Sequence, residues 1–111
     1  MKYKINYTSK AQRDLDGIWD YIASEYQNIS SADRTVQAIM DAVDQLERFP
    51  GLGPPLDSIV DIKSDYRFLT TGKYLTFYRI LGAEIRVERI LYGSRDYSPY
   101  LLDDSSNQES K

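Results

Sequence analysis

Arginines gather in one run of the 111-residue chain, YLTFYRILGAEIRVERILYGSRDY, which spans residues 74–97. Their positions are Arg79, Arg86, Arg89 and Arg95. A guanidinium group stays charged at any physiological pH and binds a carboxylate or phosphate through two parallel hydrogen bonds. In a small domain, such side chains are either buried, which costs free energy, or face the surroundings of the protein. The first question is therefore what these guanidinium groups bind.

The rest of the composition limits the chemistry that the arginines could assist. The chain has no cysteine and no histidine, so disulfides, thiolate chemistry and imidazole acid–base chemistry are excluded. Only carboxylates remain as ligands for a metal, and we therefore expect no metal site and no cofactor. A general acid or base would have to be an aspartate, glutamate, lysine or tyrosine.

Charge is distributed unevenly along the chain. The formal net charge is −3, which argues weakly against binding to bulk nucleic acid. Residues 63–100 nevertheless carry seven basic and four acidic side chains, whereas residues 1–62 carry six basic and ten acidic ones. Either this is the chance asymmetry of a small sample, or an acidic protein presents a locally basic face.

The elements that must position the arginines begin with a strand and two helices. Residues 2–7 alternate with the period of a half-buried strand. Apolar residues then recur at helical spacing from about 9 to 26 and from about 31 to 49, where Phe49 closes the second apolar stripe. Pro50 ends that helix. Because the connector between the helices is only a few residues long, we expect an antiparallel hairpin.

Three further strands are expected at about 65–70, 73–81 and 84–92, with Gly82 and Ala83 forming the last tight turn. The order β-α-α-β-β-β predicts an α+β fold. The N-terminal strand joins a mostly antiparallel sheet, and the two-helix hairpin packs on one face of that sheet.

The boundaries of the domain follow from composition. We expect one domain over residues 1–102 and a polar, disordered tail over 103–111. The N-terminus lacks the apolar run of a signal peptide, and no stretch approaches the ~20 apolar residues needed to cross a bilayer. A cytoplasmic location is the default expectation.

Strand pairing across the turn predicts which way the arginines point. The face that pairs Tyr78 with Val87 is mostly apolar, and we assign it to the helices, with Arg89 as its odd member. The opposite face pairs Arg79 with Arg86, Phe77 with Glu88, and Leu75 with Ile90.

This second face has two interpretations. Single arginines on a solvated face most often form ordinary ion pairs. Apolar residues among them favour an exposed apolar patch that binds a partner. We predict a partner-binding surface that consists of Leu75, Phe77, Arg79, Arg86 and Glu88.

The run YRFLTTGKYLTFYRILGAEIRVERILYGSRDY resembles the core of the RelE/ParE superfamily of type II toxins. SKAQRDLDGIWDYIASEY is similar to the first helix of that family, and LERFPGLGPPL to the end of its second helix and the following loop. The resemblance covers residues 3 to about 101. It implies a growth-inhibiting toxin of a plasmid-stabilisation, or addiction, module that a co-expressed antitoxin protein holds inactive.

The resemblance also implies one of two actions. ParE-like members inhibit DNA gyrase and are not known as enzymes, whereas RelE-like members cleave mRNA on the ribosome. By position, the nuclease residues of the RelE-like branch fall at Arg67, Leu69, Leu75, Arg95 and, approximately, Tyr97 or Tyr100. Leucine cannot act on a phosphate, so we favour the ParE-like action. A relative that only binds its antitoxin is a third hypothesis.

Under the nuclease hypothesis, the catalytic residues would be Arg67, Arg95 and Tyr97. Neither arginine is a sensible base, since its pKa lies above ~12. Glu88 or Asp96 could serve as the base only if it lay close to the site.

Overall fold

The computed structural model describes residues 2–58 and 64–93 of the chain. The elements follow the predicted β-α-α-β-β-β order and form an α+β fold. They are β1 (Lys4–Tyr7), α1 (Ser9–Glu25), α2 (Ile29–Asp44), β2 (Arg67–Thr71), β3 (Tyr74–Leu81) and β4 (Glu84–Tyr92), with short 3-10 helices at Gln45–Glu47 and Leu56–Ser58. The predicted end of the domain at residue 102 and the tail over 103–111 lie outside the described residues.

Side-chain caps fix where the two helices begin. The Thr8 hydroxyl accepts a hydrogen bond from the Ala11 N–H at 3.0 Å, as expected for a helix that starts after Thr8. The second helix starts at Ile29, slightly before the predicted position near Ser31. The reason is that the Asn28 side chain, rather than a serine, accepts from the Ser31 N–H at 3.0 Å.

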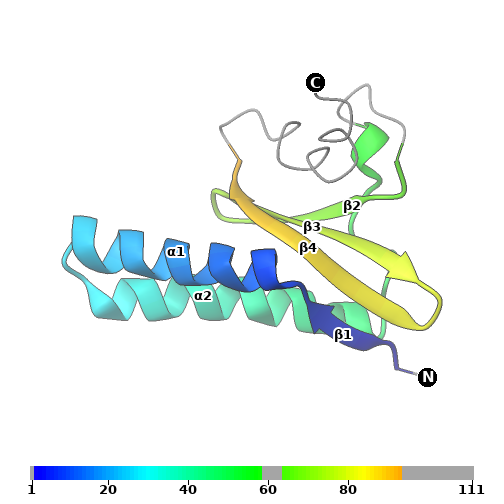
Figure 1. The fold of residues 1–111 in the computed structure, drawn as a ribbon, viewed down its shortest axis with the longest axis horizontal. Helices are drawn as coiled ribbons and strands as arrows, with labels where there is room; N and C mark the ends of the chain where they lie inside the picture. Colours follow the sequence, from blue (N-terminus) through cyan, green and yellow to red (C-terminus); the bar gives the residue numbers. More distant parts are fainter. Residues whose placement is uncertain (1, 59–63, 94–111) are drawn as a thin grey trace.

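The four strands form one sheet in the order β1-β4-β3-β2. β1 runs parallel to β4, and the other neighbours are antiparallel. The two helices run antiparallel beside each other, and the hairpin extends well past the edge of the sheet (Figure 1). The main core lies between the hairpin and the sheet and is made of Ala11, Leu15, Ile39, Val43, Leu46, Leu69, Tyr78, Ile85, Val87 and Ile90.

A β-bulge corrects the predicted pairing of the last two strands. Near the turn the register is as expected, with Arg79 opposite Arg86 and Tyr78 opposite Val87. The register shifts between Phe77 and Tyr78, so that Phe77 lies opposite Arg89 and not Glu88. A bulge inserts one extra residue into one strand and moves all later pairs. The predicted pairs beyond this point are therefore wrong.

The second face of the sheet carries a small core of its own. Phe77 is fully buried in a cluster with Leu56, Phe68 and Leu91. Leu75, which is half-buried, packs against that cluster. Ile90 belongs instead to the main core on the helix side. The expectation of an exposed apolar patch at Leu75, Phe77 and Ile90 is therefore wrong. The 3-10 helix at Leu56–Ser58 supplies the cover that the sequence pattern did not reveal.

Within residues 2–58 and 64–93, no helix is long and apolar enough to span a membrane. The same residues contain no group of three or more carboxylates placed to hold a metal ion.

Candidate partner-binding surfaces

Arg89 and Asp14 form a clamp between α1 and β4. The Arg89 Nε and Nη2 atoms donate to the two carboxylate oxygens of Asp14 at 2.8 and 2.9 Å. The Ile90 backbone N–H donates to the same carboxylate at 2.9 Å. This contact lies beyond the end of β1, which pairs with β4 only as far as Val87, so Asp14 takes the place of a strand on that side of β4. Arg89 thus contacts the helix layer, and its charge forms a salt bridge within the molecule.

Arg79 is held by two carboxylates on the other side of the sheet. Its Nε lies 3.0 Å from Asp65 Oδ1, and its Nη1 lies 3.5 Å from Glu88 Oε2. Its guanidinium carbon also lies 5.7 Å from the centre of the Tyr66 ring, within cation–π range. The hydrogen bond to Asp65 is the main reason that the pKa of Arg79 is raised.

Arg86 lies directly opposite Arg79, which would be unfavourable for two unpaired like charges. Its Nη2 lies 3.6 Å from Glu84 Oε1, so each arginine of the pair has its own carboxylate. The Asn6 side chain donates to Glu84 at 2.8 Å and, together with Arg86, lowers the pKa of that glutamate. We call the four side chains Arg79, Glu84, Arg86 and Glu88 the charged face.

Arg67, which keeps a positive charge at one of the positions of the nuclease hypothesis, also has its guanidinium group bound within the molecule. Its Nε donates to the Gly53 carbonyl at 2.7 Å, and its Nη2 to the Gly51 carbonyl at 3.5 Å. Leu69, at the next nuclease position, is buried under the helices. The other candidates, Arg95 and Tyr97, lie outside the described residues. So do Asp96 and Tyr100.

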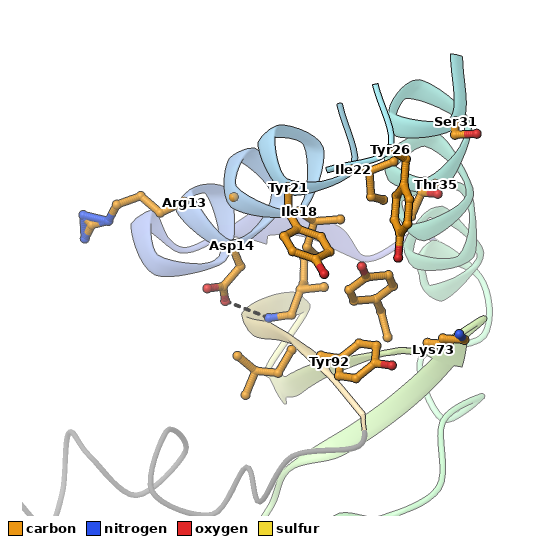
Figure 2. A pocket seen from close by; sticks show the side chains of 14 residues that line it. Arg13, Asp14, Ile18, Tyr21, Ile22, Tyr26, Ser31, Thr35, Lys73 and Tyr92 are labelled. Atoms are coloured by element: carbon orange, nitrogen blue, oxygen red, sulfur yellow. Dashed lines mark hydrogen bonds between the residues drawn. The ribbon is translucent and has the colours of Figure 1, made fainter. Parts of the chain in front are cut away.

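A groove of about 860 Å³ lies between the hairpin and the C-terminal end of β4. Its walls carry tyrosines at positions 21 and 26 on the helix side and at 74 and 92 on the sheet side, and Lys73 lies at its rim (Figure 2). Asp14, bound to the Ile90 N–H, forms part of the lining. Arg13 points away from the rings (Figure 2). We call this feature the tyrosine groove.

The tyrosines are arranged as two edge-to-face pairs. The ring centres of Tyr21 and Tyr26 are 6.1 Å apart, and those of Tyr74 and Tyr92 are 5.8 Å apart. Tyr26 is 66% exposed and Tyr21 is 55% exposed. Burial raises the pKa of Tyr74, and the neighbouring Tyr26 raises the pKa of Tyr21, so both of these hydroxyls favour their neutral form. Neutral phenols on an open apolar surface are suited to bind another protein.

Sequence reasoning missed the groove because Tyr21, Tyr26 and Tyr74 fit the periods of residues that pack in a helix or strand. Tyr26 keeps the helical spacing of the core stripe, and Tyr74 keeps the strand alternation. Element length gave no signal. α1 has 17 residues and the longest strand, β4, has 9, so at about 1.5 and 3.3 Å per residue the two have similar lengths. The hairpin tip projects past the sheet because of how the two layers are placed against each other (Figure 1).

Comparison with known proteins gives consistent findings. The family model of the ParE toxin of the type II toxin–antitoxin system, parDE, matches residues 5–97. No functionally curated protein matches the chain significantly.

Two solved structures are similar to the chain. The chromosomal ParDE toxin–antitoxin system from P. aeruginosa shares 29% identity, with a TM-score of 0.66, over 82% of this chain and 96% of that chain. The RelBE2 toxin–antitoxin complex from Mycobacterium tuberculosis has a TM-score of 0.61 at 21% identity. The match covers 83% of this chain and 99% of that chain, and this likeness shows the fold alone. Because the family model spans most of the sequence, the chain belongs to the ParE toxin family of type II toxin–antitoxin systems.

Proposed function

We propose that the chain is a ParE-type toxin that inhibits a protein target, DNA gyrase, and that a cognate antitoxin neutralises it. The family match over residues 5–97 supports the toxin role. The choice of a protein target over mRNA rests on one observation, which is the use of Arg67 as a structural residue.

Cleavage of RNA needs an acid, a base and cations placed around the phosphate. Arg67 directs its guanidinium to the carbonyls of Gly53 and Gly51, and Leu69 and Leu75 offer no charge. Even Glu88, the carboxylate considered as a base, is shared with Arg79. An inhibitor that acts by binding needs none of these groups.

The antitoxin contact is best supported at the tyrosine groove. Both similar structures are toxin–antitoxin systems or complexes, and the groove is a large concave surface with exposed rings. We infer that an amphipathic antitoxin segment places apolar side chains between Tyr26 and Tyr92 and a carboxylate near Lys73.

The charged face stays part of the proposal as a second, weaker contact. Arg86 is 41% exposed and Arg79 is 31% exposed, so both can reach a partner carboxylate without leaving their own. Phe77 is fully buried in the second core and Leu75 packs against that core, so neither is counted among the exposed contacts of this face. Arg79→Glu should therefore weaken antitoxin binding or toxicity modestly while the protein remains folded.

Two assays on the purified protein test the proposed target. One measures DNA supercoiling by purified gyrase. The other is cell-free translation followed by primer extension on the mRNA. Blocked supercoiling with intact mRNA is expected. Cuts at codon-spaced positions would support the nuclease instead. If the protein binds antitoxin tightly but has neither effect, it is a relative that has lost toxicity.

A further inference from the structure

A second exposed apolar feature lies at the opposite end of α2 from the groove. Phe49 is 62% exposed and Leu52 is 51% exposed, although the sequence pattern placed Phe49 in the core stripe. Both side chains lie in the loop at residues 48–53, which follows the helical hairpin close to β1 (Figure 1). A helix of 16 residues is about 24 Å long, so this loop and the hairpin tip are separate surfaces.

The loop is held in one shape by hydrogen bonds. The Leu52 N–H donates to the Phe49 carbonyl at 3.0 Å, which closes a tight turn. The buried Tyr78 hydroxyl donates to the Pro50 carbonyl at 2.7 Å and accepts from the Gly53 N–H at 3.0 Å. Burial raises the pKa of Tyr78 and keeps this donor protonated. We call this element the Phe49/Leu52 turn.

Two more residues lock the base of the turn. Arg67 donates through Nε to the Gly53 carbonyl at 2.7 Å. Gly53 is buried, and a Cβ atom there would lie 2.2 Å from the Phe68 carbonyl oxygen. Any larger residue would force the backbone apart, so the glycine permits a close approach that sets the direction of the turn.

A rigid turn that exposes a phenylalanine and a leucine is well suited to bind a folded protein. Binding costs less when the contact residues are already ordered, and a buried aromatic anchor often dominates the energy of an interface. Arg48, next to Phe49, is exposed, and no carboxylate among residues 2–58 and 64–93 forms an ion pair with it. The complementary surface would be an apolar pocket bordered by carboxylates.

We propose that the Phe49/Leu52 turn is the contact by which the toxin holds its protein target, away from the groove that takes the antitoxin. This inference rests on the proposed function. RNA is a poorer fit because affinity for RNA depends on several free cations, and Arg67 is already bound to carbonyls, which leaves Arg48 as the cation of this loop.

The test compares three purified proteins in a gyrase supercoiling assay. They are the unaltered chain, the double variant Phe49→Ser/Leu52→Ser, and the matched control Ile29→Ser, which removes a side chain that is 63% exposed at the hairpin tip. The double variant should need at least about 30-fold more protein for half inhibition, as expected for the loss of an interface anchor. The control should stay within about twofold. Thermal unfolding of all three checks that they are folded.

The possible outcomes separate the two proposals. If the unaltered chain inhibits gyrase and the double variant inhibits it equally, the turn is not the target contact, and the proposed function stands. If the unaltered chain leaves supercoiling untouched, both the gyrase proposal and this inference fail. A photoreactive phenylalanine analogue at position 49 adds a direct readout. Cross-linking to a gyrase subunit is expected, and cross-linking only to RNA or to a second copy of the chain contradicts the inference.

Discussion

The charged face and the tyrosine groove differ in how completely the molecule satisfies their side chains. Arg79 and Arg86 each have a carboxylate within 3.6 Å, and neither has to leave it to remain stable. Tyr21 and Tyr26 contact each other but remain more than half exposed. A charge on a protein surface is well solvated by water, whereas covering exposed rings with a partner removes apolar surface from water and lowers the free energy. Under the proposed function, we therefore expect the groove to contribute most of the antitoxin affinity.

The largest effect is expected from removing two rings of the groove. Tyr26→Ala combined with Tyr92→Ala should weaken antitoxin binding by about 100-fold, since aromatic anchors each account for ~1–2 kcal/mol or more in such interfaces. Isothermal titration with the cognate antitoxin measures this change. Phe49→Ala, which removes an equally exposed ring at the other end of α2, is the matched control for affinity. Equal losses in the two proteins would show that the groove has no special role.

The largest effect on stability, as opposed to affinity, is expected at Asp14, which lines the groove and lies outside the charged face. This carboxylate lines the groove and also binds Arg89 and the Ile90 N–H. Asp14→Ala removes the carboxylate that binds the mostly buried Arg89 guanidinium and accepts from the Ile90 N–H, which should cost about 3 kcal/mol of unfolding free energy. Urea denaturation measures the loss.

Asp14→Asn separates the two parts of that cost. The amide oxygen can still accept from the Ile90 N–H, but it no longer neutralises Arg89. We expect a stability between those of the unaltered protein and Asp14→Ala. If asparagine is as harmful as alanine, then the charge, not the backbone hydrogen bond, holds α1 against β4.

The fold could be predicted from local patterns, because each element has a clear period and a stop signal. Gly82, whose φ is +62°, begins the last turn as expected. The predicted end of the second helix at Pro50 is wrong, because α2 ends at Asp44 and a short 3-10 helix follows it. The alternation of residue types did not predict the bulge near Phe77, because one inserted residue does not change the composition of a strand. The register error and the wrong exposure of Ile90 share this cause.

The site was harder to predict because partners of charged residues lie far apart in sequence. Arg89 binds a carboxylate 75 positions away, and Arg79 binds one 14 positions away. Ordinary ion pairs were one of the two interpretations of this face, and the structure has such contacts between Arg79 and Glu88 and between Arg86 and Glu84. The groove depends on how far one layer extends past another, which is a property of the assembled fold.

A smaller effect is expected on the charged face. Arg79→Glu should reduce antitoxin affinity only about fivefold, because exposed ion pairs contribute roughly 0.2–1 kcal/mol each and the substitution reverses one charge. Titrations at 50 and 500 mM salt should show that this difference shrinks with screening. Arg48→Glu, a charge reversal at an exposed position at the other end of α2 from the groove, is the control. A loss as large as that of the tyrosine variant would reverse the ranking of the two surfaces.

The smallest effect is the acid response of Glu84. Its pKa in the folded protein is lowered, first by the Asn6 hydrogen bond and then by Arg86. A lowered pKa means that the ionised form stabilises the fold above the unfolded value of 4.5, and that this contribution disappears as pH falls through the folded value. Glu84→Gln lacks the titration, so its stability should lie slightly below that of the unaltered protein near pH 6, and the gap should close on acidification. Urea midpoints between pH 6 and 3 measure the gap, and a constant difference across that range would mean that the charged face contributes nothing through Glu84.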